Sequence, residues 1–207
     1  MRWTARNLDT VAAATLLHVE LVLAAIAVAL IIGLPLGLAV ARAARLRAAV
    51  LGGASILYSL PTLALFALLV PGLGFWPALV ALVTYALPIL LRALVAGLAS
   101  VPPAVLDAAT GMGLTARQRL WRVELPLAMP ALLGGLRIAG VTLVSAATVG
   151  ALIGAGGLGV LILTGLDQGH TEKILVGAGL VAALALVLDQ ALALVQRRLP
   201  ASRAVPA

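Results

Sequence analysis

The chain has 207 residues, of which 63% are hydrophobic and 10% are charged, and its mean hydropathy is +1.19. Soluble domains average about 45–50% apolar and 25% charged residues, so this composition excludes a soluble domain and predicts an integral membrane protein. The net charge is +7, and the absence of cysteine excludes disulfides and thiolate metal sites.

Five apolar stretches are long enough to cross a bilayer, since about 30 Å of hydrocarbon needs roughly 20 residues of helix. Their Ala and Gly content favours close packing between helices in lipid. The first stretch is too long for the apolar core of a cleavable signal peptide, so we expect it to stay in the mature chain. The sequence predicts an all-α membrane protein with about five transmembrane helices, at Leu16–Val40, Val50–Val70, Phe75–Leu98, Ala131–Ile153 and Ile174–Val195.

Arginines gather in the connections on one side of these spans. Because Lys and Arg accumulate in cytoplasmic loops, we expect the N-terminus outside and the C-terminus in the cytoplasm, and we interpret the basic excess as topology rather than nucleic-acid binding. Residues 1–15 are then an extracytoplasmic segment, 16–198 a single transmembrane domain and 199–207 a cytoplasmic tail. The arginines concerned are Arg42, Arg45, Arg47, Arg117, Arg119, Arg122, Arg197, Arg198 and Arg203.

The segment LIGAGGLGVLI, residues 152–162, contains Gly154, Gly156 and Gly159 at the spacing of a dinucleotide-binding loop. That motif needs a buried strand before it and an acidic residue about 20 positions further on to hold a ribose. Here an apolar span precedes it and position 179 is glycine, so the sequence does not predict nucleotide binding.

The same glycines have a structural interpretation in an outer loop of about residues 154–173. Gly156, Gly157 and Gly159 are expected to turn the chain out of the fourth span and to bring backbone close to neighbouring helices. Val160–Leu166 is expected to be a short apolar segment that dips back toward the bilayer.

A connection of about residues 99–130 is predicted on the cytoplasmic side. Ala104–Thr110 suits a short helix, after which Gly111 and Gly113 break the chain direction. Thr115 can cap a second, amphipathic helix with the sequence ARQRLWRV. Pro126 and Pro130 are expected to end that helix and lead into the fourth span.

This connection resembles the cytoplasmic signature of permease subunits of ATP-binding-cassette importers. That signature reads Glu-Ala-Ala, three residues, Gly, nine residues, Ile, one residue, Leu-Pro. The departures here, at Asp107 and Val123, are conservative. The matching residues are Asp107, Ala108, Ala109, Gly113, Val123, Leu125 and Pro126.

The resemblance implies a coupling helix that inserts into a groove on a separate ATPase subunit, which would use ATP and Mg²⁺ while this chain binds no cofactor. It also implies an extracytoplasmic solute-binding protein, a second permease copy, alternating access, and a bacterial or archaeal cell membrane. The chain has no phosphate-binding loop ending in Lys-Ser or Lys-Thr and no catalytic constellation, so we do not expect an enzyme. An interfacial amphipathic loop without a partner is the alternative.

Most of the chain resembles one branch of these permeases, which serves glycine betaine, carnitine or choline. Related methionine and sulfonate importers share several of the patterns, so a permease for methionine or another small solute is the second interpretation. A secondary transporter or channel and a membrane enzyme are kept as other classes. The matching segments are IGLPLGLAVAR, YSLPTLALFALLVP, GMGLTARQRLWRVELPLAMPALLGGLR, ATVGALIGAGGLGVLILTGL and LVLDQALALVQRRL.

Three charged residues lie inside predicted spans at similar depth: Arg92, Arg137 and Asp189. Charges inside a membrane are costly, so we predict that Asp189 pairs with Arg137 or Arg92, either as a structural clamp or as a gating ion pair.

The translocation path is predicted to include Tyr58, Pro61, Tyr85, Pro88 and Thr148. Aromatic faces suit a quaternary ammonium, and the two prolines could kink their helices, although ordinary helix packing also explains the tyrosines. The remaining polar residues of interest, His18 and Glu20, are expected to reach interfacial water or to cap loops, without ligating a metal.

Overall fold

The computed structural model describes residues 2–69 and 74–199. Every regular element in these two ranges is helical, which confirms the predicted all-α class. The elements are α1 (Arg2–Arg6), α2 (Leu8–Ala41), α3 (Ala44–Ser59), α4 (Thr62–Leu69), α5 (Phe75–Ala99), α6 (Pro103–Gly111), α7 (Ala116–Arg119), the π-helical turn η1 (Leu120–Glu124), α8 (Leu125–Gly150), the 3₁₀ turn η2 (Ala151–Ile153), α9 (Leu158–Asp167) and α10 (Thr171–Arg197).

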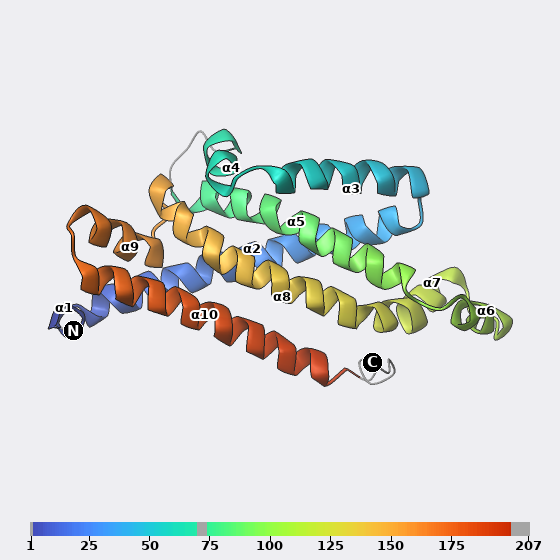
Figure 1. Ribbon diagram of the computed structural model, residues 1–207. Helices are drawn as coiled ribbons and strands as arrows, with labels where there is room; N and C mark the ends of the chain where they lie inside the picture. Colours follow the sequence, from blue (N-terminus) through green and yellow to red (C-terminus); the bar gives the residue numbers. More distant parts are fainter. Residues whose placement is uncertain (1, 70–73, 200–207) are drawn as a thin grey trace.

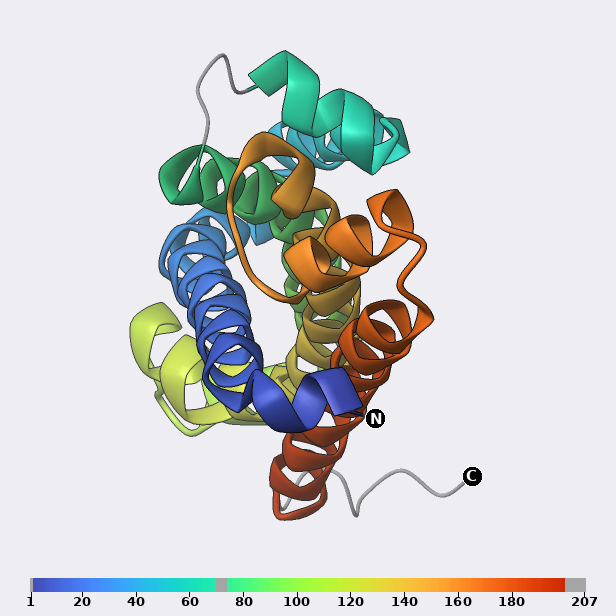
Figure 2. The ribbon, with the colours of Figure 1, turned by 90° about the vertical axis from the view of Figure 1, so that its left-hand side faces the viewer.

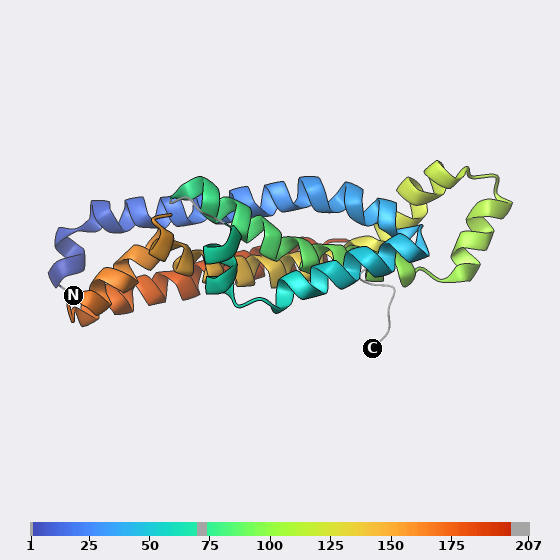
Figure 3. The same ribbon diagram turned by 90° about the horizontal axis from the view of Figure 1, so that it is seen from above.

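Helices α2, α3, α5, α8 and α10 lie side by side, and each runs opposite to the one before it in the chain, as Figures 1 and 3 show. Two short helices, α4 and α9, lie near the end of the bundle where α10 begins, and α6 and α7 project from the opposite end (Figure 1). The arginine-rich connection between α2 and α3, the segment α6–α7 and the last turn of α10 all lie at that second end. The predicted arginine-rich connections thus share one end of the bundle, and which side of the membrane this end faces stays a prediction.

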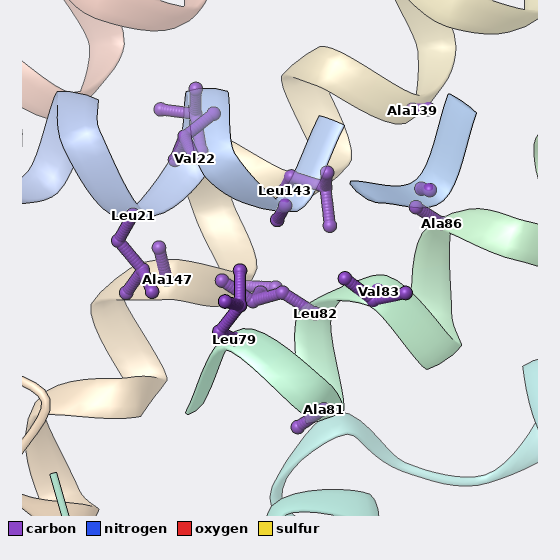
Figure 4. Close-up of a cluster of buried hydrophobic side chains, with 14 of the residues drawn as sticks. Leu21, Val22, Leu79, Ala81, Leu82, Val83, Ala86, Ala139, Leu143 and Ala147 are labelled. Atoms are coloured by element: carbon purple, nitrogen blue, oxygen red, sulfur yellow. The ribbon is translucent and has the colours of Figure 1, made fainter. Parts of the chain in front are cut away.

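The core is formed by α2, α5 and α8, whose apolar side chains meet between them (Figure 4). Small residues allow this approach: a Cβ built on Gly135 of α8 would collide with Ala93 of α5, and one on Gly97 would come within 2.9 Å of the carbonyl oxygen of Ala128. Because lipid provides no hydrophobic drive between helices, such close packing supplies much of the cohesion. Helix α10 covers α8 and α9 from one side, and α3 covers α5 from the other (Figures 1 and 2).

Four helices in the described ranges are long and apolar enough to cross a membrane: Leu8–Ala41, Phe75–Ala99, Ala116–Ile153 and Thr171–Arg197. They correspond to four of the predicted spans. The first begins two turns earlier than predicted, at Leu8 instead of Leu16.

The second predicted span, Val50–Val70, is not one continuous helix. Its helix stops at Ser59, Leu60 is extended with φ −70° and ψ 135°, and α4 starts at Thr62. Proline restricts the residue before it to extended conformations and has no amide hydrogen for the helix ladder, so Pro61 ends α3 instead of kinking it. The predicted end of this span, Val70, lies outside the described residues.

The expectation that Pro126 and Pro130 end the helix of the cytoplasmic connection is also wrong. Helical structure runs unbroken from Ala116 to Ile153. The π-helical turn Leu120–Glu124 directly precedes Pro126, which lies in the first turn of α8. Proline has no amide hydrogen to donate to the helix. A π-helical turn shifts the hydrogen-bond pattern of the neighbouring amides, so the helix continues past Pro126.

Candidate functional site

The cytoplasmic connection forms a short helix and an elbow, as the sequence predicts. Helix α6 covers the predicted Ala104–Thr110 and ends at Gly111. The amide of Gly113 donates to the carbonyl of Thr110 at 2.9 Å, and the amide of Leu114 donates to that of Ala109 at 3.2 Å. Gly113 has φ +77°, a conformation that other residues adopt only with strain. The glycine therefore sets the direction in which the chain leaves α6.

The next helix begins with the predicted threonine cap. The hydroxyl of Thr115 accepts from the amide of Gln118 at 3.3 Å, and the Gln118 side-chain oxygen accepts from the amide of Thr115 at 2.9 Å. This reciprocal arrangement is a capping box, which satisfies two amides that a helix start leaves free. The start of α7 is thus fixed by its own sequence.

Arg119 fastens the two halves of the connection together. Its Nε donates to Glu124 Oε1 at 2.8 Å, and its Nη1 donates to Thr110 Oγ1 at 3.1 Å. From the sequence, Arg119 was expected only as one of the cytoplasmic arginines, and this bridge was not predicted. Arg119 and Glu124 are five residues apart, a spacing that the intervening π-helical turn, with its i→i+5 bonds, accommodates.

The tip of the connection exposes both signature residues and apolar side chains. Asp107 and Ala108 face outward, whereas Ala109 is buried under the elbow. Around them Met112 is 72% exposed and Trp121 is 55% exposed. We call the exposed set Val105, Asp107, Ala108, Met112 and Trp121 the docking tip. The last three signature residues follow the docking tip in the chain: Val123 and Leu125 are half-buried and Pro126 is exposed.

The outer glycine loop packs against α2 and α8 by close backbone approach. Gly154, Gly156 and Gly157 have φ between +76° and +78°. A Cβ on Gly156 would collide with the side chain of Leu17, and one on Gly157 would lie 3.0 Å from His18 Nδ1. Gly159 is needed for another reason, because its Cβ would collide with the carbonyl of Thr148 in α8.

These contacts match the structural interpretation of the loop. The element before Gly154 is a helix followed by a 3₁₀ turn, not a strand, so the context of a dinucleotide fold is missing at this loop. The predicted short segment Val160–Leu166 is part of α9, which packs on α10.

His18 does not reach interfacial water as expected. Its side chain is 1% exposed, beneath the glycine loop, and its Nε2 lies 3.1 Å from the carbonyl oxygen of Val144. The glycine loop covers the histidine because Gly157 allows backbone to lie directly on it. Glu20, two residues further on, is exposed.

Asp189 pairs with Arg137, one of the two partners predicted from the sequence. Arg137 Nε donates to Oδ1 at 2.8 Å and Nη2 donates to Oδ2 at 2.9 Å, so the pair is bidentate. Gln196 extends it: its Oε1 accepts from Arg137 Nη1 at 3.2 Å, and its Nε2 donates to the carbonyl of Pro130 at 2.8 Å. Gln196 was not predicted, although it lies seven residues after Asp189 and therefore on the same face of α10.

Arg92 has different neighbours. Its Nη2 donates to Ser55 Oγ at 2.5 Å, and its Cζ lies 5.9 Å from the centroid of the Tyr58 ring. The Tyr58 ring lies 5.1 Å from that of Tyr85, with 32° between the ring planes. The structure thus brings together both tyrosines that the sequence singles out.

The other predicted path residues are placed separately. Pro61 is exposed between α3 and α4, and Pro88 is buried inside α5 on the helix face of Tyr85. Thr148 lies on α8 beneath Gly159, and its hydroxyl donates to the carbonyl of Ser145 at 2.6 Å.

Comparison with known proteins identifies the family. Residues 29–200 match the family described as binding-protein-dependent transport system inner membrane components. The chain belongs to this family. It is an inner-membrane transport permease, which confirms the resemblance noted in the sequence.

Individual relatives agree with this assignment. The chain is 39% identical to the osmoprotectant import permease protein OsmW of Salmonella typhimurium, over 88% of each chain. It is 36% identical to the glycine betaine/carnitine/choline transport system permease protein OpuCB of Bacillus subtilis, over 87% of this chain and 84% of that one.

The fold is similar to that of solved permeases. A chain of the MetNI methionine ABC transporter, in an inward-facing conformation, superposes with a TM-score of 0.83 at 24% identity, over 93% of this chain and 97% of that one. This likeness confirms the predicted methionine-importer-like fold.

Proposed function

We propose that this chain is the transmembrane subunit of an ATP-driven importer that translocates a quaternary-amine osmoprotectant such as glycine betaine, choline or carnitine. Its relatives of known name carry such solutes, and they match it over most of both chains. The observation that carries the coupling part of the proposal is the docking tip, which is presented by a braced helix–elbow–helix that projects from the bundle (Figure 3).

The docking tip has the chemistry of a protein interface. Met112 and Trp121 expose apolar surface at the end of the bundle where the arginines gather, with Met112 in the elbow and Trp121 near the start of the helix Ala116–Ile153. Asp107 offers a carboxylate for charge-assisted hydrogen bonds, and Ala108 leaves room for close approach. A separate ATPase subunit, which would hold ATP and Mg²⁺, is the partner that fits this surface.

The rest of the molecule fits alternating access. Helix α3 is largely exposed along its length, which suits contact with a second copy. The path would then run beside Tyr58, Pro61, Tyr85, Pro88 and Thr148. At the other end, the glycine loop and α9 offer a surface for a solute-binding protein. ATP and loaded binding protein must favour different conformations for transport to proceed.

A permease for methionine is the second candidate, favoured by the superposition on the MetNI transporter. Uptake assays with radiolabelled glycine betaine, choline, carnitine and methionine, in proteoliposomes that contain the cognate ATPase and binding protein, separate the two candidates. ATP-dependent uptake of methionine alone would replace the osmoprotectant assignment.

The coupling role is tested by Gly113→Leu. Because Gly113 has φ +77° with open space around it, the substitution strains the elbow by about 1–2 kcal/mol without a collision. We expect normal membrane insertion and ATP hydrolysis, with loss of uptake. Gly179→Leu, on α10 with open space and an ordinary helical backbone, is the matched control. Normal uptake by Gly113→Leu would contradict the coupling role.

A further inference from the structure

Four side chains from α3 and α5 form a cluster at the contact of the two helices: Ser55, Tyr58, Tyr85 and Arg92. We call it the aromatic–arginine cluster. Tyr85 is the eleventh residue of the 25-residue helix α5, so it lies roughly 15 Å from the start of the helix at 1.5 Å per residue. Tyr85, Pro88 and Arg92 follow a spacing of three and four residues, so they share one face of α5. The cluster therefore lies at membrane depth and on the side of α3.

Arg92 is a cation that lacks an anion. No carboxylate in the described part of the chain lies within ion-pair distance of it, whereas Arg137 has a bidentate partner. A guanidinium at this depth is costly in contact with lipid, and such residues face a water-filled cavity or mark a pathway for solute. Its side chain is exposed in the single chain. The Arg92 guanidinium is therefore suited to bind an anionic group from outside this chain.

The neighbouring rings supply the complementary feature. Tyr58 is 36% exposed, its ring lies at 32° to that of the half-buried Tyr85, and the Arg92 guanidinium lies over the Tyr58 ring. Ring faces attract cations, and two rings hold a cation more weakly than a full cage, which suits a site that must release its ligand. An anion-binding group and a cation-binding surface thus stand side by side.

We infer that the aromatic–arginine cluster is an intramembrane site for zwitterionic quaternary amines, and that Arg92 selects for their carboxylate. This inference rests on the proposed function and makes it more specific. The carboxylate of glycine betaine or carnitine would accept hydrogen bonds from Arg92 and draw the guanidinium away from the Tyr58 ring. The trimethylammonium group would then take its place beside the rings of Tyr58 and Tyr85. Choline carries the same ammonium group without the carboxylate, so it meets the charge of Arg92 unbalanced.

The selectivity of the permease can be separated from that of its binding protein by comparing variants with the same partners. Uptake of radiolabelled glycine betaine and of choline is measured in proteoliposomes that contain the permease, its ATPase and its binding protein. For Arg92→Gln we expect the ratio of betaine to choline uptake to fall about tenfold, since one carboxylate–arginine interaction is removed. Arg92→Lys, which keeps the charge but not the planar fork, should give a smaller fall.

Two further variants complete the design. Arg45→Gln removes an exposed arginine at the end of the bundle by the same substitution, and it should leave the ratio unchanged. Tyr58→Leu removes a ring face and should lower uptake of both solutes. If Arg92→Gln does not accumulate in the membrane, the uptake ratio of Arg92→Lys and the uptake by Tyr58→Leu still test the site.

The outcomes distinguish the site from the function. An unchanged ratio in both Arg92 variants, with wild-type uptake of betaine intact, would overturn the site alone. Absence of ATP-dependent uptake of either solute by the wild-type complex would overturn the proposed function.

Discussion

Arg92 and Arg137 are the same residue type at similar depth in neighbouring helices, yet their surroundings are opposite. Arg137 is held by both oxygens of Asp189 and by Gln196, so its charge is neutralised within the chain. Arg92 contacts a hydroxyl and a ring face. The difference arises from the helix that faces each one: α10 brings a carboxylate to α8, whereas α3 brings none to α5. An arginine in a span can therefore be structural or available, and only its neighbours decide which.

The same contrast extends to the packing around the two arginines. On the α8 side, a Cβ on Gly135 would collide with Ala93 of α5, and one on Gly140 would lie 2.9 Å from the side chain of Leu188 in α10. On the α3 side, a Cβ built on Gly52 or Gly53 would meet no atom of another element within 4 Å. The α8 side is packed closely by helices of the same chain, whereas the α3 side leaves room for a passage or a second copy.

The largest effect is expected from Asp189→Leu. This change leaves Arg137 without its anion inside the membrane, so we expect loss of folded protein, measured as the monodisperse yield from membranes and the thermal midpoint in detergent. The double variant Asp189→Leu/Arg137→Leu should recover much of the loss. Arg92→Leu should lower the midpoint far less. Equal losses for Asp189→Leu and Arg92→Leu would remove the distinction between the two arginines.

Matched glycine substitutions test the packing contrast. Gly135→Ala forces α5 and α8 apart and should destabilise the permease by about 1–3 kcal/mol. Gly53→Ala fills open space inside α3, where replacing glycine favours the helix by up to about 1 kcal/mol. Thermal unfolding of the isolated permease in detergent compares them. Destabilisation by Gly53→Ala of the same size would mean that the α3 flank is covered.

The smallest effect is expected from Gln196→Ala. It removes two hydrogen bonds, to Arg137 and to the carbonyl of Pro130, each worth about 0.5–1.5 kcal/mol, while the pair with Asp189 remains. A modest fall of the thermal midpoint with retained uptake is expected. Gln190→Ala, at an exposed position of the same helix, should change neither. A collapse as severe as that of Asp189→Leu would show that the amide, rather than the ion pair, holds α10 to α8.

The cytoplasmic connection could be predicted from the sequence because local rules determine it. Gly113 and Thr115 each act on the few residues beside them, as an elbow and a cap. The break at Pro61 was harder, because proline can kink a helix or end it, and the choice depends on packing around α3. The helix likewise continues past Pro126 because of a π-helical turn, and no local sequence pattern specifies such a turn.

Contacts between segments that are distant in the chain were harder to predict from the sequence. His18 lies under Gly157 and against Val144, which is 126 residues away, and nothing in its own segment predicts that burial. Asp189 could be matched to an arginine because charges in spans are few and need partners. The choice of Arg137 over Arg92 required knowing which helices α10 touches.

The unbroken helix from Ala116 to Ile153 has a mechanical consequence. Its 38 residues span roughly 57 Å at 1.5 Å per residue, more than the thickness of a bilayer with its headgroups. A push on Trp121 is therefore transmitted along one continuous helix that ends beside Gly154, with a π-helical turn near its start and a 3₁₀ turn at its end. Movement on one face of the membrane reaches the opposite face without crossing a flexible joint.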